Sequence, residues 1–171
     1  MSEEAKRSIS RILSRLTEVF ERAGIETPRL DAEVLLGFCL GKDRAELYRD
    51  LPVELENEQI LRILELAGRR KRREPMAYIR GFREFWSLEF AVTPAVLVPR
   101  PETECLVEEV LALRDAYRGV QARILDIGAG SGAVGIAVAS EWPDCDMTAT
   151  ECSPAALEVA RANARRLLGA N

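Results

Sequence analysis

A glycine-rich loop is the feature that most restricts the folds open to this chain. It holds an acidic residue and three alternating glycines, in the order Asp126, Ile127, Gly128, Ala129, Gly130, Ser131 and Gly132. The loop follows an apolar run at 123–127 and precedes a run at 133–140 that is typical of a helix. A second predicted strand at 147–151 leads into Ser153-Pro154, the expected cap and first residue of another helix. This order of strand, helix, strand and helix predicts the opening of a parallel α/β sheet.

The loop and the strand that follows it together predict a pocket for a cofactor that contains adenosine. Glycine lets the backbone turn tightly and lets a ligand lie against main-chain atoms. Glu151 ends the second strand, and in a right-handed βαβ unit the two strand ends lie side by side. Its carboxylate can therefore accept hydrogen bonds from both hydroxyls of a ribose held beside the loop.

The spacing of the loop leaves two cofactor classes open. Through Gly128, Gly130 and Ala133 it matches the dinucleotide fingerprint with its permitted final alanine, which is typical of NAD-type enzymes. Through Asp126 and the three glycines it matches the loop of S-adenosylmethionine methyltransferases. The leading acid, the third glycine at 132 and the late position of the unit in the chain favour S-adenosylmethionine. A glycine turn that binds no cofactor is the structural alternative.

Residues 1–74 have the period of amphipathic helices. Apolar residues of the first helix recur at steps of three and four positions: Ile9, Ile12, Leu13, Leu16, Val19, Phe20 and Ala23. Thr27-Pro28 is an expected N-cap with proline at the first helical position, and Asp43 with Glu46 resembles a capping box. The last helix should end near Glu74, because the residue before a proline avoids the α region. We predict a small helical bundle.

The period changes to two in the segment 75–96, which links the bundle to the rest of the chain. Alternating apolar residues in 85–92 predict one strand: Trp86, Leu88, Phe90 and Val92. Residues 77–80, just before Gly81, are the expected partner strand of a β-hairpin. The predicted fold is therefore α/β: a helical bundle, a β-hairpin linker and the first half of a doubly wound, Rossmann-like domain over 97–171.

Composition excludes several kinds of site and partner. The chain has no histidine, which rules out Ser-His-Asp and Cys-His nucleophiles and histidine-ligated metals within it. Its cysteines have no Cys-x-x-Cys spacing, so we expect no metal site. A net charge of −4 argues against coating nucleic acid by charge alone. With no signal peptide and no uncharged run long enough for a bilayer, we expect a cytoplasmic protein with no membrane partner.

The basic run 69–73 has two interpretations. Five consecutive Lys or Arg residues can contact nucleic acid. The other interpretation is a solvated last turn of a helix, where cations suit the helix dipole. We favour the second, and expect no direct binding of nucleic acid.

Three segments outside the glycine loop carry a more specific pattern. The first is Thr27-Pro-Arg-Leu-Asp-Ala-Glu-Val-Leu-Leu36, the second runs from Glu74-Pro75 to Gly81 and on to Glu84-Phe85-Trp86, and the third is Leu97-Val-Pro-Arg-Pro-Glu-Thr-Glu104. In this order they resemble the HemK/PrmC family of protein-glutamine methyltransferases. The resemblance implies S-adenosylmethionine-dependent methylation of the glutamine amide in the Gly-Gly-Gln loop of class I peptide-chain release factors. It implies that residues 1–74 and the hairpin recognise that partner, and that 97–171 are a partial methyltransferase domain.

The resemblance also implies roles for single residues in binding the cofactor. The loop residues Gly128, Ala129, Gly130, Ser131 and Gly132 would contact its methionine part through the backbone. Asp126 would orient the loop or reach the methionine amino group. Glu151 would bind the ribose, where the family more usually has aspartate. Arg100, Thr103 and Glu104 would line the methyl-transfer end, with Phe85 close by.

The residues alone leave other roles open for this last group. Glu102 and Glu104 stand near an expected helix N-terminus, where acidic side chains favour the helix dipole without any ligand. Phe85 begins an alternating strand, where an aromatic ring usually packs in the core.

The family's reaction needs a device that this sequence lacks. An amide nitrogen is a poor nucleophile, and the family aims it with an Asn-Pro-Pro-Tyr motif after the fourth strand, so that catalysis is largely positioning. None of the three asparagines here precedes a proline. We therefore expect an N-terminal piece of a longer enzyme, with no catalytic residue of its own. A docking module that binds a release factor without cofactor is the alternative.

The 171-residue chain alone should transfer no methyl group. The reason is that it has no motif to aim the amide nitrogen. The measurement is incorporation of label from S-adenosylmethionine into the Gly-Gly-Gln glutamine of a purified release-factor domain. Stoichiometric labelling by this chain would contradict the expectation.

Overall fold

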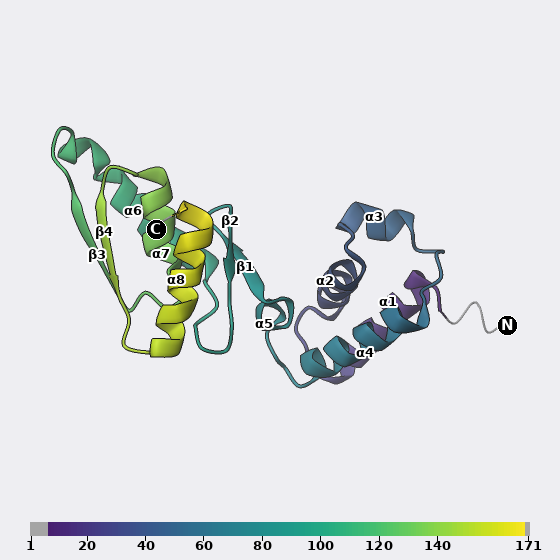
Figure 1. Cartoon of the computed structure of the whole chain (residues 1–171). Coiled ribbons are helices and arrows are strands. Elements are labelled where there is room, and N and C mark those ends of the chain that lie inside the picture. The colour runs from purple at the N-terminus through teal and green to yellow at the C-terminus, as the bar shows by residue number, and fades with distance from the viewer. Residues whose placement is uncertain (1–6, 170–171) are drawn as a thin grey trace. The chain divides into compact units, whose positions relative to one another are not determined.

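The computed structural model describes residues 7–169 (Figure 1). Within this range the chain divides into two units, with the division between Arg80 and Gly81. The first unit is helical, and the second combines helices with strands. No helix among the described residues has both the length and the apolar character that crossing a membrane requires.

The first unit is the helical bundle that the sequence predicts. Its helices are α1 (Ile9–Arg22), α2 (Pro28–Leu40), α3 (Arg44–Arg49), α4 (Asn57–Lys71) and α5 (Met76–Arg80). Fully buried side chains from the first four of them form one core: Leu13, Phe20, Leu35, Leu36, Leu47 and Ile63. Because these residues recur at helical spacing, each helix buries one apolar stripe.

Local signals set the starts of two helices. Asp43 Oδ1 accepts a hydrogen bond from Glu46 N at 2.7 Å, and Glu46 Oε2 accepts one from Asp43 N at 2.9 Å, which confirms the capping box. Pro28 begins α2 as predicted. Thr27 is the N-cap residue as predicted, but its side chain makes no cap hydrogen bond, because its hydroxyl donates to the carboxylate of Asp31 at 3.2 Å.

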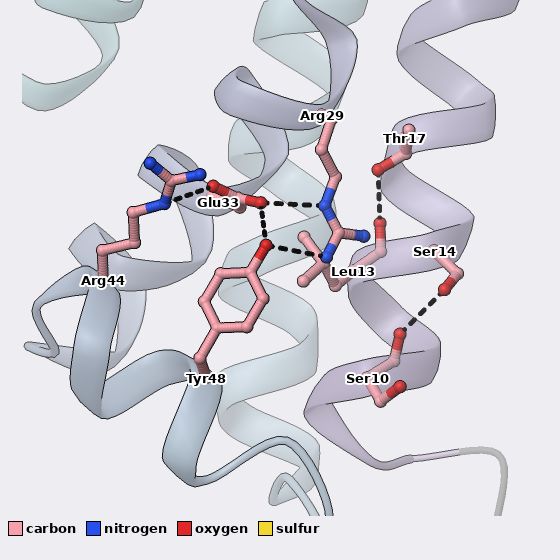
Figure 2. Close-up of polar contacts among 8 residues, drawn as sticks. All are labelled: Ser10, Leu13, Ser14, Thr17, Arg29, Glu33, Arg44 and Tyr48. Carbon is pink, nitrogen blue, oxygen red and sulfur yellow. Dashed lines mark hydrogen bonds and ion pairs between the residues drawn. The ribbon is translucent and has the colours of Figure 1, made fainter.

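Glu33 is a buried carboxylate, 4% exposed, that ties α2 to α3 (Figure 2). It accepts hydrogen bonds from Tyr48 Oη and from Arg29 Nε, the latter at 2.8 Å. Its other oxygen pairs with Arg44 Nε at 3.0 Å. Burial opposes ionisation, but the hydrogen bonds and positive charges around the carboxyl outweigh it and lower the pKa of Glu33. The carboxylate therefore stays charged inside the bundle.

The guanidiniums of the basic run 69–73 pair within the first unit. Arg70 Nε lies 2.7 Å from Asp31 Oδ2, and these side chains are only 17% and 11% exposed. Two further contacts of the run join Arg69 to Glu74 and Arg73 to the carbonyl of Gly24. The predicted solvated turn is confirmed for Lys71, Arg72 and Arg73, which are exposed. It is wrong for Arg69 and Arg70, which are half-buried, because carboxylates of the bundle accept their N–H groups.

The strand predicted at 77–80 is wrong, because these residues lie in α5. The helix starts directly after Pro75, whose restricted φ suits the first turn of a helix. Tyr78 N and Ile79 N both donate to Pro75 O, at 3.0 and 3.1 Å. Three apolar residues in a row, Ala77 to Ile79, fit a short helix as well as a strand, so the pattern alone could not distinguish the two.

The hairpin lies further along, where β1 (Phe82–Phe85) pairs antiparallel with β2 (Leu88–Ala91). The single strand predicted over 85–92 is therefore also wrong. Trp86 and Ser87 form the turn, with φ of 53° and 55°. Both values are left-handed, as a two-residue type I′ turn requires, and asparagine or glycine usually marks such a turn. Neither is present here, so the alternation of apolar residues concealed the turn.

The second unit contains the predicted strand, helix, strand and helix. In order these are β3 (Arg123–Ile127), α7 (Ala133–Glu141), β4 (Asp146–Thr150) and α8 (Pro154–Leu168). The strands are parallel, with Leu125 opposite Thr148. Ser153 Oγ accepts from Ala156 N at 3.3 Å, which confirms the cap of α8. The unit is a partial Rossmann-like fold.

One face of this sheet carries the core of the second unit. Ahead of the sheet lie η2 (Pro101–Thr103), α6 (Glu104–Ala112) and η3 (Arg114–Tyr117). Buried side chains from the hairpin, α6 and α7 pack together: Phe85, Phe90, Val107, Ala137 and Val138. Leu125 and Ile127 of β3 are 57% and 78% exposed. Since alternate residues of a strand point to opposite faces, the second face of the sheet is exposed, and it carries these two apolar side chains beside Thr148 and Thr150 of β4.

Replacing Glu33 with Gln should destabilise the helical unit by about 1–3 kcal/mol at pH 7, because Arg29 and Arg44 lose a buried charge-assisted partner. The pKa of Glu33 is lower in the folded state, so its contribution is complete above about pH 5 and is lost as the pH falls through the folded value. The variant's stability should therefore fall less between pH 7 and pH 4 than that of the unmodified chain.

Thermal unfolding followed by circular dichroism checks this expectation. Both tryptophans, Trp86 and Trp142, lie in the second unit, so tryptophan fluorescence should be unchanged. Glu18→Gln is the matched control, because that carboxylate is 62% exposed on α1 and its loss should change stability by less than about 0.5 kcal/mol. Equal effects of the two substitutions would contradict the role of Glu33.

Candidate cofactor site

The candidate site lies where β3 and β4 end, and its floor is the glycine loop 128–132. Gly128 N and Ala129 N donate to Thr150 O at 2.8 and 3.0 Å. Gly132 N then donates to Ala129 O at 2.7 Å, which closes a tight turn into α7. The loop is thus bonded to the end of the neighbouring strand, in the manner of the carboxyl edge of a parallel sheet.

The three loop glycines have left-handed φ, and the surroundings of a side chain differ among them. Their φ values are 80°, 57° and 80° at Gly128, Gly130 and Gly132. A Cβ at either of the first two would meet no atom within 4 Å, so the space beside this backbone is open. A Cβ at Gly132 would lie 2.8 Å from Ile136 Cδ1 and 3.4 Å from Ala160 Cβ. Gly128 and Gly130 leave room for a ligand, whereas Gly132 leaves room for the side chain of Ile136 where the loop enters α7.

Glu151 reaches the loop directly. Its Oε2 accepts from Gly130 N at 2.9 Å, and its Oε1 accepts from Ser153 N at 3.0 Å. The backbone hydrogen bonds from Ser153 and Gly130 lower the pKa of Glu151, so the carboxylate is ionised at neutral pH. The structure therefore brings the acidic strand end and the glycine loop together, with a negative charge between them.

Asp126 faces the helix that follows the loop. Its Oδ2 accepts from Gly135 N, in the first turn of α7, at 3.2 Å. A Cβ at Gly135 would lie 3.1 Å from the same oxygen, so glycine is what allows this approach. A carboxylate here also suits the helix dipole. Asp126 thus orients α7 relative to the strand that precedes the loop.

The segment 100–104 contacts the hairpin. Glu104 Oε1 accepts from Trp86 N at 2.8 Å, and so holds the left-handed hairpin turn. Thr103 N donates to Arg100 O at 3.0 Å within η2. Arg100 is exposed, and its guanidinium has no ion-pair partner among residues 7–169. In that range no hydrogen bond joins this segment to the glycine loop.

Phe85 lies in the core of the second unit. It is 1% exposed, and its ring meets that of Phe90 edge to face, with centroids 6.1 Å apart. This is the packing role that the alternation of the segment left open, and aromatic pairs of this geometry stabilise a core.

Asn163, on α8, contacts the glycine loop, although the sequence did not predict this. It is fully buried, and its Nδ2 donates to the carbonyl of Ser131 in the glycine loop at 2.9 Å. The available signal was a single polar residue on an otherwise apolar stripe of the helix. That stripe is Ala156, Ala160, Asn163 and Leu167.

Gly132→Ala should destabilise the second unit by about 2–4 kcal/mol, because a left-handed φ and an overlap with Ile136 act together. Gly128→Ala is a matched control with the same φ of 80° and no atom in the way, and should cost about 1–2 kcal/mol. Urea unfolding followed by tryptophan fluorescence measures both. A loss at Gly128 as large as that at Gly132 would show that the overlap with Ile136 adds nothing to the cost.

Two domain families match the chain, one in each unit. Residues 11–81 match the PrmC N-terminal domain. Residues 102–168 match the methyltransferase small domain, which includes the glycine loop and Glu151. The matches follow the order of the helical bundle and the α/β unit described above.

Curated relatives named release factor glutamine methyltransferase are similar to most of the chain. The relative from Salmonella typhimurium is 45% identical over 142 residues, which are 83% of this chain and 50% of the relative. The relative from Coxiella burnetii is 44% identical over 163 residues, covering 95% and 55%. That from Burkholderia pseudomallei is 49% identical over 140 residues, covering 81% and 48%.

The chain therefore spans about half the length of the curated relatives it matches. The identity runs through both units, and the two domain matches stand in a fixed order. Together these findings show that the chain, a PrmC N-terminal domain followed by a methyltransferase small domain, belongs to the PrmC family.

Proposed function

We propose that the protein containing this chain methylates the glutamine side-chain amide in the Gly-Gly-Gln loop of a class I peptide-chain release factor. S-adenosylmethionine is the proposed methyl donor. The name carried by the relatives supports the reaction and the substrate class. The observation that carries the cofactor assignment is the contact of Glu151 with Gly130, next to glycines with open space beside them.

The residues of the site fit this cofactor in shape and in charge. The methionine part would lie along the backbone of Gly128 and Gly130, where nothing occupies the side-chain position. Glu151 is ionised and would accept the ribose hydroxyls. The cofactor supplies a methyl group on a positively charged sulfonium. The loop fixes its position, which is the main contribution a protein makes to a transfer of this kind.

Two other functions are compatible with parts of the chain. A NAD-type enzyme uses the same βαβ unit, and the loop satisfies its fingerprint through Ala133. The first unit alone can serve as a docking module for a release factor. Each alternative has its own readout, because one needs a dinucleotide and the other needs no cofactor.

The first unit is the proposed contact with the release factor. On α4, Leu61 and Leu64 are 68% and 58% exposed and stand one turn apart. Apolar side chains left in solvent at that spacing can contact a protein partner. The proposed partner works with the ribosome, so action in the cytoplasm is part of the same proposal.

Calorimetry with S-adenosylhomocysteine and with NAD tests the cofactor assignment. The first should bind and the second should not. Glu151→Gln should weaken S-adenosylhomocysteine binding by about tenfold or more, because a charge-assisted hydrogen bond is lost. Glu158→Gln is the matched control, because that carboxylate is 71% exposed on α8 and pairs only with Arg161 among the described residues.

Binding of NAD without S-adenosylhomocysteine would overturn the assignment in favour of the dinucleotide class. If neither ligand binds, capture of a release factor by residues 1–95 would instead support the docking module.

A further inference from the structure

We propose that Asn163 is a positioning residue for the cofactor loop, and that it makes the shape of the loop depend on the hairpin strand β2. The inference rests on the proposed function in one respect: the loop is taken to bind the cofactor. Among residues 7–169, no hydrogen bond joins Asn163 to Glu151, Gly128 or Gly130. It acts on the loop through the backbone of Ser131.

Both polar atoms of the Asn163 amide have hydrogen-bond partners, and these partners fix which atom is the oxygen and which the nitrogen. Its Oδ1 accepts from Ala91 N at 2.9 Å, and its Nδ2 donates to Ala91 O at 3.0 Å and to Ser131 O at 2.9 Å. The side chain is fully buried, so water cannot replace any of these bonds. Turning the amide over would direct its oxygen at two carbonyl oxygens, which leaves one favourable orientation.

Toward the hairpin, Asn163 takes the place of a further strand. Val92 N donates to Gly81 O at 2.9 Å, so this pair carries the hydrogen bonds of the ladder. The neighbouring pair, Phe82 and Ala91, therefore directs its backbone groups away from the ladder. Asn163 satisfies both the N–H and the C=O of Ala91 on that outer edge, and thereby fastens β2 to α8.

Toward the loop, Asn163 fixes one peptide group from its carbonyl side. The peptide between Ser131 and Gly132 has its oxygen on Asn163 and its N–H on Ala129 O, at 2.9 and 2.7 Å. A peptide held at both ends cannot rotate, so the left-handed φ of 80° at Gly132 is maintained. The end of the loop, next to the backbone that would face the cofactor, is therefore set by a contact on its buried side.

The test compares two substitutions at Asn163 with a core truncation elsewhere in the same unit. Asn163→Asp keeps the shape but directs a carboxylate at the carbonyls of Ala91 and Ser131. Asn163→Ala removes the amide and serves if the aspartate variant does not fold. Val107→Ala is the control, because Val107 is fully buried in α6 and no hydrogen bond joins its side chain to the loop.

Two measurements are made on the full chain, well below the unfolding temperature of each variant. The first is the affinity for S-adenosylhomocysteine by calorimetry, which should fall about tenfold or more at Asn163 and less than about twofold at Val107. The second is hydrogen exchange at the amides of Ala91 and Gly132. Exchange should quicken at both in Asn163→Ala, and at Gly132 in Asn163→Asp, whose Oδ1 can still accept from Ala91 N.

Unchanged affinity in the Asn163 variants, or an equal loss in Val107→Ala, would overturn the proposal. If the unmodified chain binds no S-adenosylhomocysteine, the proposed function fails while the exchange measurement still reads the link between hairpin and loop. In that case, faster exchange confined to Ala91, with Gly132 protected, would overturn the link itself.

Discussion

The peptide groups of the glycine loop are held from three directions, and the second unit is arranged around them. Gly128 N donates to Thr150 at the end of β4, Gly130 N to Glu151, and the carbonyl of Ser131 accepts from α8. Glycine permits left-handed φ without steric strain, and the hydrogen bonds to these partners favour that conformation of the loop. The strand, the acid and the helix must therefore all be in place before the loop has its working shape.

The elements that the sequence predicted correctly are those whose ends are marked by residues with restricted backbone or capping preferences. Alternating glycines, Ser153-Pro154 and the Asp43 capping box each restrict the backbone locally, so their consequences follow without tertiary information. The hairpin turn had no such mark. Trp86 and Ser87 have left-handed φ, and Glu104, eighteen positions further along the chain, stabilises their turn by accepting the N–H of Trp86. A long-range contact of that kind leaves no local pattern.

The candidate site divides in the same way. The proximity of Glu151 to the loop follows from the topology of a βαβ unit, and the structure has it as a hydrogen bond. Glu104 and Asn163 bond backbone groups that have no partner within their own strand or loop. Which groups these are depends on how the helices pack against the hairpin and the loop. The basic run 69–73 was also not predictable from local sequence. Its charge suggested solvent or a nucleic-acid partner, but Arg70 pairs with Asp31, thirty-nine positions earlier in the chain.

The exposed face of the sheet favours self-association of the chain in solution. Leu125 and Ile127 stand 57% and 78% exposed beside parallel strands, whereas parallel sheets ordinarily have both faces covered. Apolar side chains next to strand edges invite other chains to add on, so self-association should increase with protein concentration. Hydrophobic attraction weakens on cooling. We therefore expect the least self-association of this 171-residue chain in dilute, chilled solution.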